Sequence, residues 1–359
     1  MPGLKESKGY TIIKEMMAAK DRQPFLFQEQ AWEHIISGES GLVNAPTGCG
    51  KTYSVFLGAI IDFINHHPDD HKKIKNSGLQ LLWITPLRAL ATDIGRAMEE
   101  VIAELGMNWK VGIRNGDTST TERTKQKKQM PEVLIITPES LHLLIGQKAR
   151  LPDGQGYAEI FSSLKIIAVD EWHELLGSKR GVQVELALAR IVNSPSRPSR
   201  REGDPLHKTP PIENVSYNDD TPLSRHMCGS EALPSGGFGG AAVSIWGISA
   251  TIGNLEEASD VLLSSLKKPG VMVKAEMKKQ IEVESIFPDE IEKYPWAGHL
   301  GIKLVHKILP IIHESKTTLI FINTRGMSEI WYQQILNASP DLAGAIALHH
   351  GSVERELRE

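Results

Sequence analysis

The stretch that decides the fold is Ala45-Pro46-Thr47-Gly48-Cys49-Gly50-Lys51-Thr52. It lies between the short apolar run Gly41–Val43 and the helical pattern Tyr53–Asn65. Glycines let a backbone bend until successive N–H groups face one anion, and a helix start adds unpaired donors and a positive dipole end. The spacing predicts a phosphate-binding loop, in which Lys51 reaches the β/γ-phosphates of a nucleotide and Thr52 holds Mg²⁺. Ala45 replaces the first glycine of the general pattern, and such a match can arise by accident.

A second motif, Asp170-Glu171-Trp172-His173, follows an apolar run that predicts a buried strand at Leu164–Val169. Ligands of open α/β sheets bind beyond the carboxyl ends of the strands, so we expect this motif and the phosphate loop at one edge. There Asp170 can hold the Mg²⁺ that bridges the phosphates, and Glu171 can orient and deprotonate the attacking water. Taken alone, the motif is better explained by a solvated acidic turn. The phosphate loop upstream favours the catalytic interpretation.

Together these motifs belong to an ordered set that resembles the DExH-box helicases of superfamily 2. The other members, in chain order, are Phe27-Gln28 (a Q-motif-like adenine contact), Thr85-Pro86-Leu87-Arg88-Ala89-Leu90 (motif Ia), Thr137-Pro138-Glu139-Ser140-Leu141 (motif Ib), Ser249-Ala250-Thr251 (motif III) and Phe321-Ile322-Asn323-Thr324-Arg325 (motif IV). Trp172, the stretch Trp246–Asn254 and His349-His350-Gly351-Ser352 resemble the Lhr (large helicase-related) branch, and within it the ligase-associated DNA-damage-response members. The resemblance extends from residue 25 to the end of the chain.

For the nucleotide, the resemblance implies that ATP lies between two RecA-like lobes, with Gln28 at the adenine and residues 45–52 around the phosphates. His173 would then connect the γ-phosphate to motif III, where the hydroxyls of Ser249 and Thr251 provide the coupling. Without the resemblance, Gln28 fits a surface helix and His173 fits a hydrogen-bonded position at the sheet edge. Ser249 and Thr251 then fit simple strand-end caps.

For nucleic acid, the resemblance places a track across the opposite edge of the lobes, with contacts from Arg88, Thr137, Pro138, Thr324 and Arg325. Arg88 at a helix start can pair with a phosphate, and groups at Thr137 can hold phosphate oxygens. Such contacts follow the backbone, so we expect no base preference. Each is otherwise an ordinary surface residue, and Glu139 and Ser140 fit the cap region of the next helix. The basic cluster Thr124–Gln129 fits a solvated helix face better than a nucleic-acid contact.

Composition narrows the class of protein without deciding it. The 359 residues are 40% hydrophobic and 23% charged, which is ordinary for a soluble protein of two or more domains. The formal net charge of −4 argues against a general polyanion-binding surface, so nucleic acid must follow a local track. Two cysteines cannot form a disulfide framework, and no apolar run reaches the roughly 18 residues of a membrane span. The first residues lack the apolar core of a secretion signal, and we therefore expect a cytoplasmic protein.

Short apolar runs alternate with helical patterns over the first part of the chain. The runs are Leu79–Thr85, Lys110–Ile113, Val133–Thr137, Lys165–Asp170 and Val243–Ser249, and the helical patterns include Gln28–Ile36, Ala89–Leu105 and Val182–Val192. This order predicts an α/β fold whose parallel sheet is covered by helices on both faces. The resemblance implies the same architecture, a RecA-like P-loop NTPase domain.

Two domains are expected: the ATP-binding domain over residues 1–272 and the first part of a second RecA-like domain over 273–359. Within the second, we expect a helix over Leu300–His313 and a strand over Thr317–Asn323. The chain stops before motifs V and VI of superfamily 2, so it resembles the front part of a longer helicase.

Residues 193–242 interrupt the first domain with a segment rich in Pro, Ser and Gly. A stretch of this composition and length predicts a disordered insertion. The alternative is that Arg197, Arg200 and Arg201 within it touch a nucleic-acid backbone.

The favoured function is an ATP-dependent helicase or translocase that moves on single-stranded DNA and unwinds duplexes or DNA–RNA hybrids. The Lhr-like motifs imply 3′-to-5′ movement, a role in DNA repair and, through the subfamily alone, association with a DNA ligase. The first alternative is an RNA remodeller like the DEAD-box proteins, against which His173 in place of a second Asp argues. The second is a truncated module that binds ATP and nucleic acid with little hydrolysis, because motif VI supplies the arginine finger, which is typically worth about 10³–10⁵ in rate.

Overall fold

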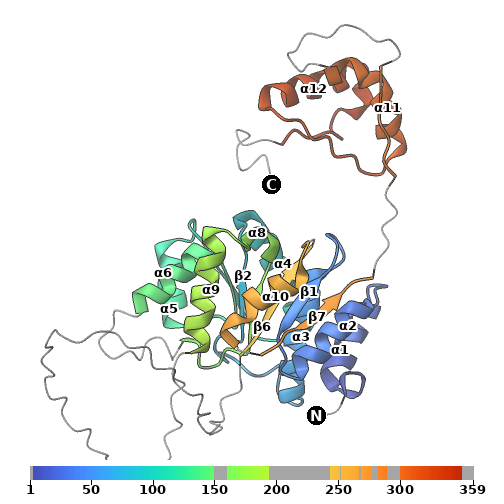
Figure 1. Cartoon of the computed structure of the whole chain (residues 1–359). Helices are drawn as coiled ribbons and strands as arrows, with labels where there is room; N and C mark the ends of the chain where they lie inside the picture. Colours follow the sequence, from blue (N-terminus) through green and yellow to red (C-terminus); the bar gives the residue numbers. More distant parts are fainter. Residues whose placement is uncertain are drawn as a thin grey trace, which may run out of the picture. The chain divides into compact units, whose positions relative to one another are not determined.

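The computed structural model describes residues 3–148, 160–193, 243–250, 252–266, 268–276, 282–288 and 300–349 (Figure 1). The chain divides into two compact units, Met1–Met277 and Lys278–Glu359. The insertion predicted at 193–242 lies outside the described residues except for Asn193, which caps the end of a helix. Arg197, Arg200 and Arg201 lie outside them as well, so their contacts with nucleic acid stay a prediction.

A seven-stranded parallel sheet forms the centre of the first unit. Its strands, in spatial order, are β3 (Val111–Arg114), β4 (Val133–Ile136), β2 (Leu81–Ile84), β5 (Ile166–Val169), β6 (Ser244–Ser249), β1 (Gly41–Asn44) and β7 (Val271–Lys274). Every pairing between neighbours is parallel. Each strand predicted in this unit is present, so the expected α/β, RecA-like fold is confirmed.

The last strand, β7, corrects the expected end of the first unit. We expected the second domain to begin at residue 273, but β7 pairs with β1, with Val273 opposite Val43. Val273 is also buried in the core of the first unit. Because β7 completes this sheet, the first unit extends to Met277.

Helices and turns fill the connections between the strands. In the first unit they are η1 (Leu4–Glu6), α1 (Lys8–Ala18), α2 (Leu26–Ile36), α3 (Lys51–His66), α4 (Arg88–Glu104), α5 (Thr120–Lys128), α6 (Pro138–Lys148), α8 (Trp172–Leu175), α9 (Lys179–Val192), α10 (Leu255–Leu263) and η2 (Ser264–Leu266). Ser7, Ser119, Ser178 and Asn254 start four of them by accepting a backbone N–H that the helix leaves unpaired. None of the helices in the described ranges is both long and apolar enough for a membrane span.

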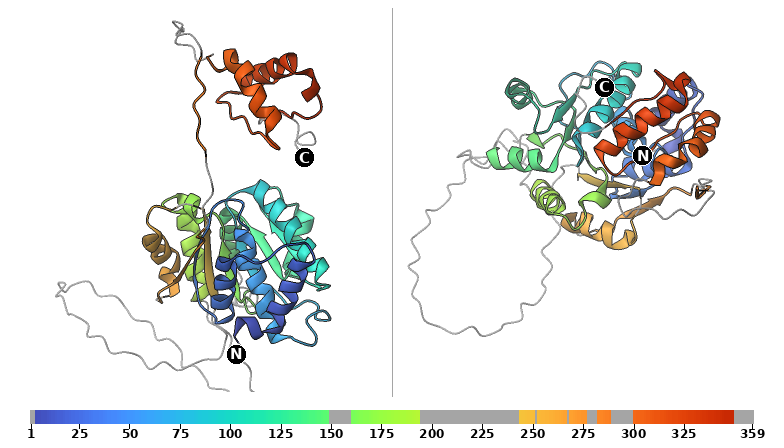
Figure 2. Two further views of the ribbon diagram at one scale, coloured as in Figure 1. Left: turned by 90° about the vertical axis from the view of Figure 1, so that its right-hand side faces the viewer. Right: turned by 90° about the horizontal axis from the view of Figure 1, so that it is seen from above.

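Helices cover both faces of the sheet, because alternate residues of each strand point to opposite sides. In β2, Leu81 and Trp83 pack into a core with α1–α4, whereas Leu82 and Ile84 pack into a second core with α6, α8, α9 and α10. The blue-to-cyan helices of the first core face the viewer in the left panel of Figure 2. Burial on both faces explains why the strands are continuous apolar runs.

Parallel pairing brings the carboxyl ends of β1, β5 and β6 to one edge of the sheet. Asn44 lies opposite Ser249, and Val169 lies opposite Gly247. The phosphate loop follows β1, the Asp170–His173 motif follows β5, and motif III ends β6. The two motifs predicted to share an edge therefore do so, with motif III between them.

The second unit has a small helical core of its own. Its described helices are η3 (Leu300–Leu304), α11 (Val305–Glu314), α12 (Arg325–Ala338) and η4 (Pro340–Leu342). The buried hydrophobic residues of this core are Val305, Trp331 and Ile335. The helix predicted over Leu300–His313 is thus present as η3 followed by α11.

The strand predicted at Thr317–Asn323 is wrong for the described part of the second unit, which contains no strand. Leu319 and Phe321 are 78% and 91% exposed there. Since a strand forms only by pairing with a neighbour, an apolar run without such a neighbour stays irregular. That this unit begins a second RecA-like domain remains a prediction.

Candidate nucleotide and nucleic-acid sites

The phosphate loop is a turn between β1 and α3 that two left-handed glycines shape. Gly48 and Gly50 have φ values of 81° and 73°, a region that glycine adopts at little cost. A Cβ on Gly48 would meet only open space, so backbone conformation rather than crowding favours glycine there. At the start of the loop, the N–H of Ala45 donates to the carbonyl of Ser249 at 3.1 Å. The loop is therefore bent as the spacing predicted and is anchored to the end of β6.

Lys51, the first residue of α3, carries a buried ammonium group. Its side chain is 8% exposed, and Nζ makes no hydrogen bond to a described residue. Glu171 Oε2 lies 3.9 Å from this nitrogen. Burying N–H donors without acceptors costs free energy, and an ammonium has three of them. An anion placed against the loop would satisfy these donors.

Two adjacent carboxyl groups face this ammonium from the end of β5. Asp170 is 4% exposed, and its Oδ1 accepts the N–H of Glu171 at 3.0 Å. Burial and the negative charge of Glu171 raise the pKa of Asp170 to about 7, although this hydrogen bond and Lys51 act in the opposite direction. Glu171 itself lies in the left-handed region, with φ 47° and ψ 46°. Such a backbone costs a non-glycine residue roughly 1–2 kcal/mol, so the surrounding fold holds Glu171 in place against strain.

Thr52 and Asp170 are the oxygen donors expected to hold Mg²⁺. Thr52 is half-buried in the first turn of α3, and Asp170 lies at the same edge of the sheet. Mg²⁺ takes hard oxygen ligands and binds through one or two protein groups together with phosphates and water. In the described ranges, no cluster of three or more His, Cys, Asp or Glu side chains could hold a metal alone. Burial and the neighbouring charge of Glu171 raise the pKa of Asp170, and such a carboxyl group fits a divalent cation that arrives with a phosphate ligand.

His173 connects this acidic pair to motif III. Its Nδ1 lies 3.1 Å from Ser249 Oγ and 3.4 Å from Glu171 Oε2. Ser249 is fully buried at the end of β6. The structure therefore places the predicted coupling residues His173 and Ser249 in contact, whereas Thr251 lies outside the described residues.

Trp172 fixes the short helix that carries His173. The indole is fully buried, and its Nε1 donates to the carbonyl of Ala258 in α10 at 2.9 Å. This hydrogen bond attaches α8, which starts within motif II, to α10, the helix that follows motif III. From the sequence, Trp172 was interpreted only as a feature of the Lhr branch, and its structural role was not predicted.

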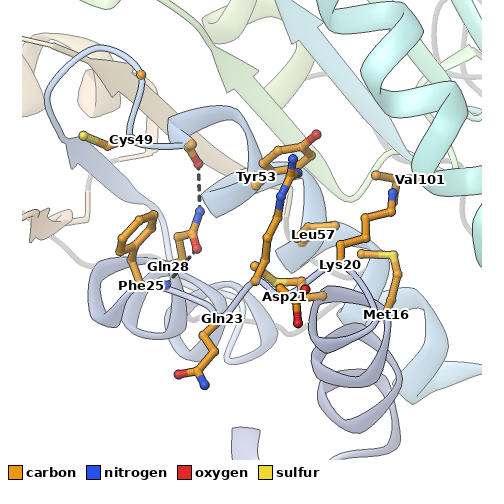
Figure 3. A pocket seen from close by; sticks show the side chains of 14 residues that line it. Met16, Lys20, Asp21, Gln23, Phe25, Gln28, Cys49, Tyr53, Leu57 and Val101 are labelled. Atoms are coloured by element: carbon orange, nitrogen blue, oxygen red, sulfur yellow. Dashed lines mark hydrogen bonds between the residues drawn. The ribbon is translucent and has the colours of Figure 1, made fainter. Parts of the chain in front are cut away.

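A cavity of about 670 Å³ lies beside the phosphate loop (Figure 3). It is lined by Phe25 and Gln28 at the start of α2, by Tyr53 of α3, and by residues of α1 and α4 such as Met16 and Val101. Gln28 Oε1 accepts the N–H of Phe25 at 2.9 Å, and Nε2 donates to the carbonyl of Gly50 at 3.0 Å (Figure 3). One N–H and one lone pair of the amide stay available for a base. The position of the cavity beside the phosphate loop and its aromatic lining fit the adenine ring of a nucleotide.

At the other end of the same sheet edge, Arg88 is the first residue of α4 and Thr137 directly precedes α6. Arg88 is 61% exposed and pairs with Asp117 at 3.1 Å. Thr137 is buried, and its Oγ1 lies 3.2 Å from Ser140 Oγ at the start of α6, which begins with Pro138. Arg88 thus presents its guanidinium to the surface, whereas the Thr137 hydroxyl is engaged within the cap of α6.

The predicted contacts of the second unit lie at the start of α12. Thr324 caps this helix by accepting the N–H of Met327 at 3.4 Å, and Arg325 is its exposed first residue. Both stand at a helix N-terminus, where backbone donors and the dipole favour an anion.

The basic cluster Thr124–Gln129 falls on α5, apart from its last residue. Lys125 is 73% exposed and pairs with Glu122 at 3.8 Å, one turn away on the same helix. Gln126 turns inward and donates to the carbonyl of Ile113. The cluster is therefore a solvated helix face of the kind expected.

A sequence model of the DEAD/DEAH box helicase family matches residues 25–204, half of the chain. The chain belongs to this family. The match begins at Phe25 beside the cavity, and it includes the phosphate loop and the Asp170–Glu171 pair. The predicted DExH-box membership is confirmed.

Relatives of this helicase family member are Lhr proteins. The chain is 30% identical over 347 residues to the ATP-dependent helicase Lhr-Core protein 2 of Thermococcus barophilus, covering 92% of this chain and 34% of that protein. It is 35% identical over 181 residues to the Lhr helicase/uracil glycosylase of Escherichia coli, covering 47% of this chain and 11% of that protein. The chain therefore spans about a third or less of the length of these relatives. Similarity to Lhr proteins was predicted, whereas the ligase-associated branch remains a prediction.

The fold is also found in solved helicases. The Mycobacterium smegmatis helicase Lhr bound to single-stranded DNA and AMP-PNP matches with a TM-score of 0.65 and 24% identity, covering 97% of this chain and 39% of that one. The DUF1998 helicase MrfA bound to DNA matches with a TM-score of 0.66 and 20% identity, covering all of this chain and 42% of that one. At such identities the likeness establishes the fold.

Proposed function

We propose that this chain belongs to an ATP-driven nucleic-acid motor of the Lhr type. The main support is the buried ammonium of Lys51, which makes no hydrogen bond to a described residue and lies 3.9 Å from Glu171 Oε2, beside the buried carboxyl group of Asp170. A buried cation with unused N–H donors, next to two adjacent carboxyl groups, fits a bound anion together with its divalent cation. A nucleoside triphosphate with Mg²⁺ supplies both.

In this site each side chain has a separate task. Lys51 would donate to the β/γ-phosphates, and Thr52 and Asp170 would hold Mg²⁺, which would supply positive charge to the transferred phosphoryl group. Glu171 would accept a proton from the attacking water. This role requires a carboxylate about one water molecule away from the phosphorus atom. The contact between His173 and Ser249 would couple the nucleotide site to motif III. Adenine occupies the cavity at Gln28 and Phe25.

For nucleic acid, the proposed path follows Arg88, Thr137 and Pro138 in the first unit and Thr324 and Arg325 in the second. We infer that single-stranded DNA is the track, with 3′-to-5′ movement and unwinding of duplexes or DNA–RNA hybrids. Support comes from the similarity to Lhr proteins and from the exposed guanidinium of Arg88. RNA as the track, a role in DNA repair, a DNA ligase as partner and a cytoplasmic location stay predictions.

The test is binding of a fluorescent ATP analogue with Mg²⁺ to the 359-residue chain and to Lys51→Ala. We expect Lys51→Ala to weaken binding at least about tenfold, because charge-assisted contacts to the phosphates are lost. Lys179→Ala removes an exposed lysine outside the site and serves as the matched control, with unchanged affinity. Equal binding by Lys51→Ala and the wild type would refute the nucleotide site.

Nucleic-acid dependence is tested separately by ATP hydrolysis with single-stranded DNA, RNA or no addition. Stimulation by DNA, with unwinding of long duplexes, supports the proposed motor. Unwinding of short RNA duplexes alone identifies an RNA remodeller. Binding of both ligands with little hydrolysis identifies a binding module.

A further inference from the structure

Arg180, in the first turn of α9, joins two turns that are far apart in sequence. Its Nε donates to Glu139 Oε1 at 2.6 Å, and its Nη2 donates to the carbonyl of Pro86 at 2.6 Å. Nη2 also lies 3.5 Å from Glu139 Oε2. Pro86 belongs to the turn between β2 and α4, and Glu139 is the second residue of α6. One planar guanidinium thus connects the starts of three helices.

The backbone holds the start of α9 where this connection requires it. Ser178 caps the helix by accepting the N–H of Gly181 at 3.1 Å. A Cβ at Gly181 would lie 2.1 Å from the carbonyl oxygen of Leu175, so the close turn between α8 and α9 requires glycine. Since α8 begins directly after Glu171, Arg180 is fixed relative to the nucleotide edge as well.

The partners of Arg180 are arranged to receive it. Pro86 is buried, so its carbonyl has little access to water. Partial burial pulls the pKa of Glu139 upward, but its own backbone N–H and the hydrogen bond and charge of Arg180 lower it overall, so the carboxylate stays ionised. Arginine suits this position because its rigid fork can bond a carboxylate and a carbonyl at once, whereas lysine is a single flexible point charge.

We propose that Arg180 is a positioning residue that sets the spacing between the two nucleic-acid-contacting turns, the one before Arg88 and the one at Thr137. This inference rests on the proposed function, since those two residues are its proposed contacts. In this proposal Arg180 makes no phosphate contact of its own, since its Nε and Nη2 donate to Glu139 and Pro86. It connects both turns to the helix pair that follows the catalytic Glu171.

Two contact points bind one strand more tightly when the protein holds their spacing fixed, because less conformational freedom is then lost on binding. Helix α4 starts without a side-chain cap, because its N-cap residue, Leu87, makes no side-chain hydrogen bond to the helix. The Arg180–Pro86 hydrogen bond therefore takes the place of a local restraint on the turn that precedes Arg88. Loss of Arg180 leaves both contact residues in the chain but removes their common anchor.

The experiment measures single-stranded DNA binding by fluorescence anisotropy over a range of salt concentrations, using a labelled oligothymidine and the 359-residue chain. The variants are Arg180→Ala, Arg180→Lys, Glu139→Gln and the double variant Arg180→Ala with Glu139→Gln. Lys179→Ala is the control, because it removes a neighbouring exposed lysine outside the connection. Binding of a fluorescent ATP analogue and thermal unfolding are recorded for each protein.

We expect Arg180→Ala and Glu139→Gln each to weaken DNA binding about three- to tenfold, with a smaller loss for Arg180→Lys. The double variant should be no worse than either single one, since both remove the same connection. Lys179→Ala should change binding less than twofold, and ATP-analogue affinity should be unchanged throughout. The salt dependence should keep its slope, because no phosphate contact is lost.

Glu139→Gln distinguishes a positioning role of Arg180 from a simple effect of surface charge. If charge alone governed this surface, Glu139→Gln would remove a negative charge and strengthen DNA binding, and that result would overturn the proposal. A salt slope reduced by about one in Arg180→Ala would also overturn it, because it identifies a direct phosphate contact. Wild-type protein that binds ATP analogue but neither DNA nor an RNA oligonucleotide would instead refute the proposed nucleic-acid track itself.

Discussion

At the scale of single residues, the site concentrates groups that are unfavourable without a ligand. Lys51 is a buried ammonium without a hydrogen bond, Glu171 has a strained backbone, and Asp170 has a pKa of about 7. Each costs folding free energy, and each would be relieved or used if the proposed triphosphate and metal bound there. Such a concentration of unfavourable groups at one sheet edge is typical of a functional site.

Glu171→Gln separates binding from chemistry. The amide keeps the size of the side chain but is a poor base, so nucleotide affinity should stay within about threefold while hydrolysis falls by a factor of roughly 10² or more. Affinity from a fluorescent ATP analogue and phosphate release under the same conditions provide the two readouts. Normal phosphate release by Glu171→Gln would show that the catalytic carboxylate is assigned wrongly.

At the scale of elements, two short connections set the geometry of the site. The Trp172 indole ties α8 to α10, and the tight turn at Gly181 ties α8 to α9. Trp172 follows the Asp170–Glu171 pair directly in sequence, and Gly181 lies ten residues after Glu171. The position of motif II relative to motif III and to the nucleic-acid turns therefore depends on a few residues.

Trp172→Phe should lower the free energy of unfolding by about 2–4 kcal/mol, because buried indole volume and the hydrogen bond from its Nε1 to the Ala258 carbonyl are both lost. Trp109→Phe is the matched control: Trp109 is buried too, but its Nε1 makes no hydrogen bond to a described residue. Chemical denaturation of both variants measures the difference. Equal losses in the two variants would mean that the Trp172 hydrogen bond contributes nothing measurable.

Gly181→Ala tests the turn between α8 and α9. A Cβ there would approach the Leu175 carbonyl oxygen to 2.1 Å, so the backbone must shift, and we expect a loss of about 2 kcal/mol or more. Gly146→Ala, in α6, meets open space and should stabilise the protein by roughly 0.5–1 kcal/mol through helix propensity. Thermal unfolding of the two variants should therefore shift in opposite directions, and a gain for Gly181→Ala would contradict the close turn.

Sequence patterns predicted those elements whose signal is local. The phosphate loop, the Asp170–His173 motif and the strands of the first unit follow from spacing and apolar runs, and all are found. The apolar run Thr317–Asn323 has the same local signal but no described pairing partner, and pairing is not encoded in the run itself. Trp172 and Arg180 were missed as anchors because their partners lie 86, 94 and 41 residues away.

At the scale of the whole molecule, the chain comprises one α/β unit and a smaller unit whose described elements are helical. The first unit carries the proposed nucleotide site, the cavity proposed for adenine and one half of the proposed nucleic-acid track. Its relatives among Lhr proteins are about three times as long. Nucleotide binding is therefore the property that can be measured on this chain alone.

A magnesium–triphosphate complex is proposed to bind at Lys51, Thr52 and Asp170. Isothermal titration calorimetry of ATP binding, with Mg²⁺ and with excess EDTA, tests it on the wild type and on Asp170→Asn. We predict that Mg²⁺ strengthens wild-type binding at least about tenfold and that Asp170→Asn loses most of this increment while retaining metal-free binding. An equal Mg²⁺ increment in both proteins, or none in the wild type, would contradict the account.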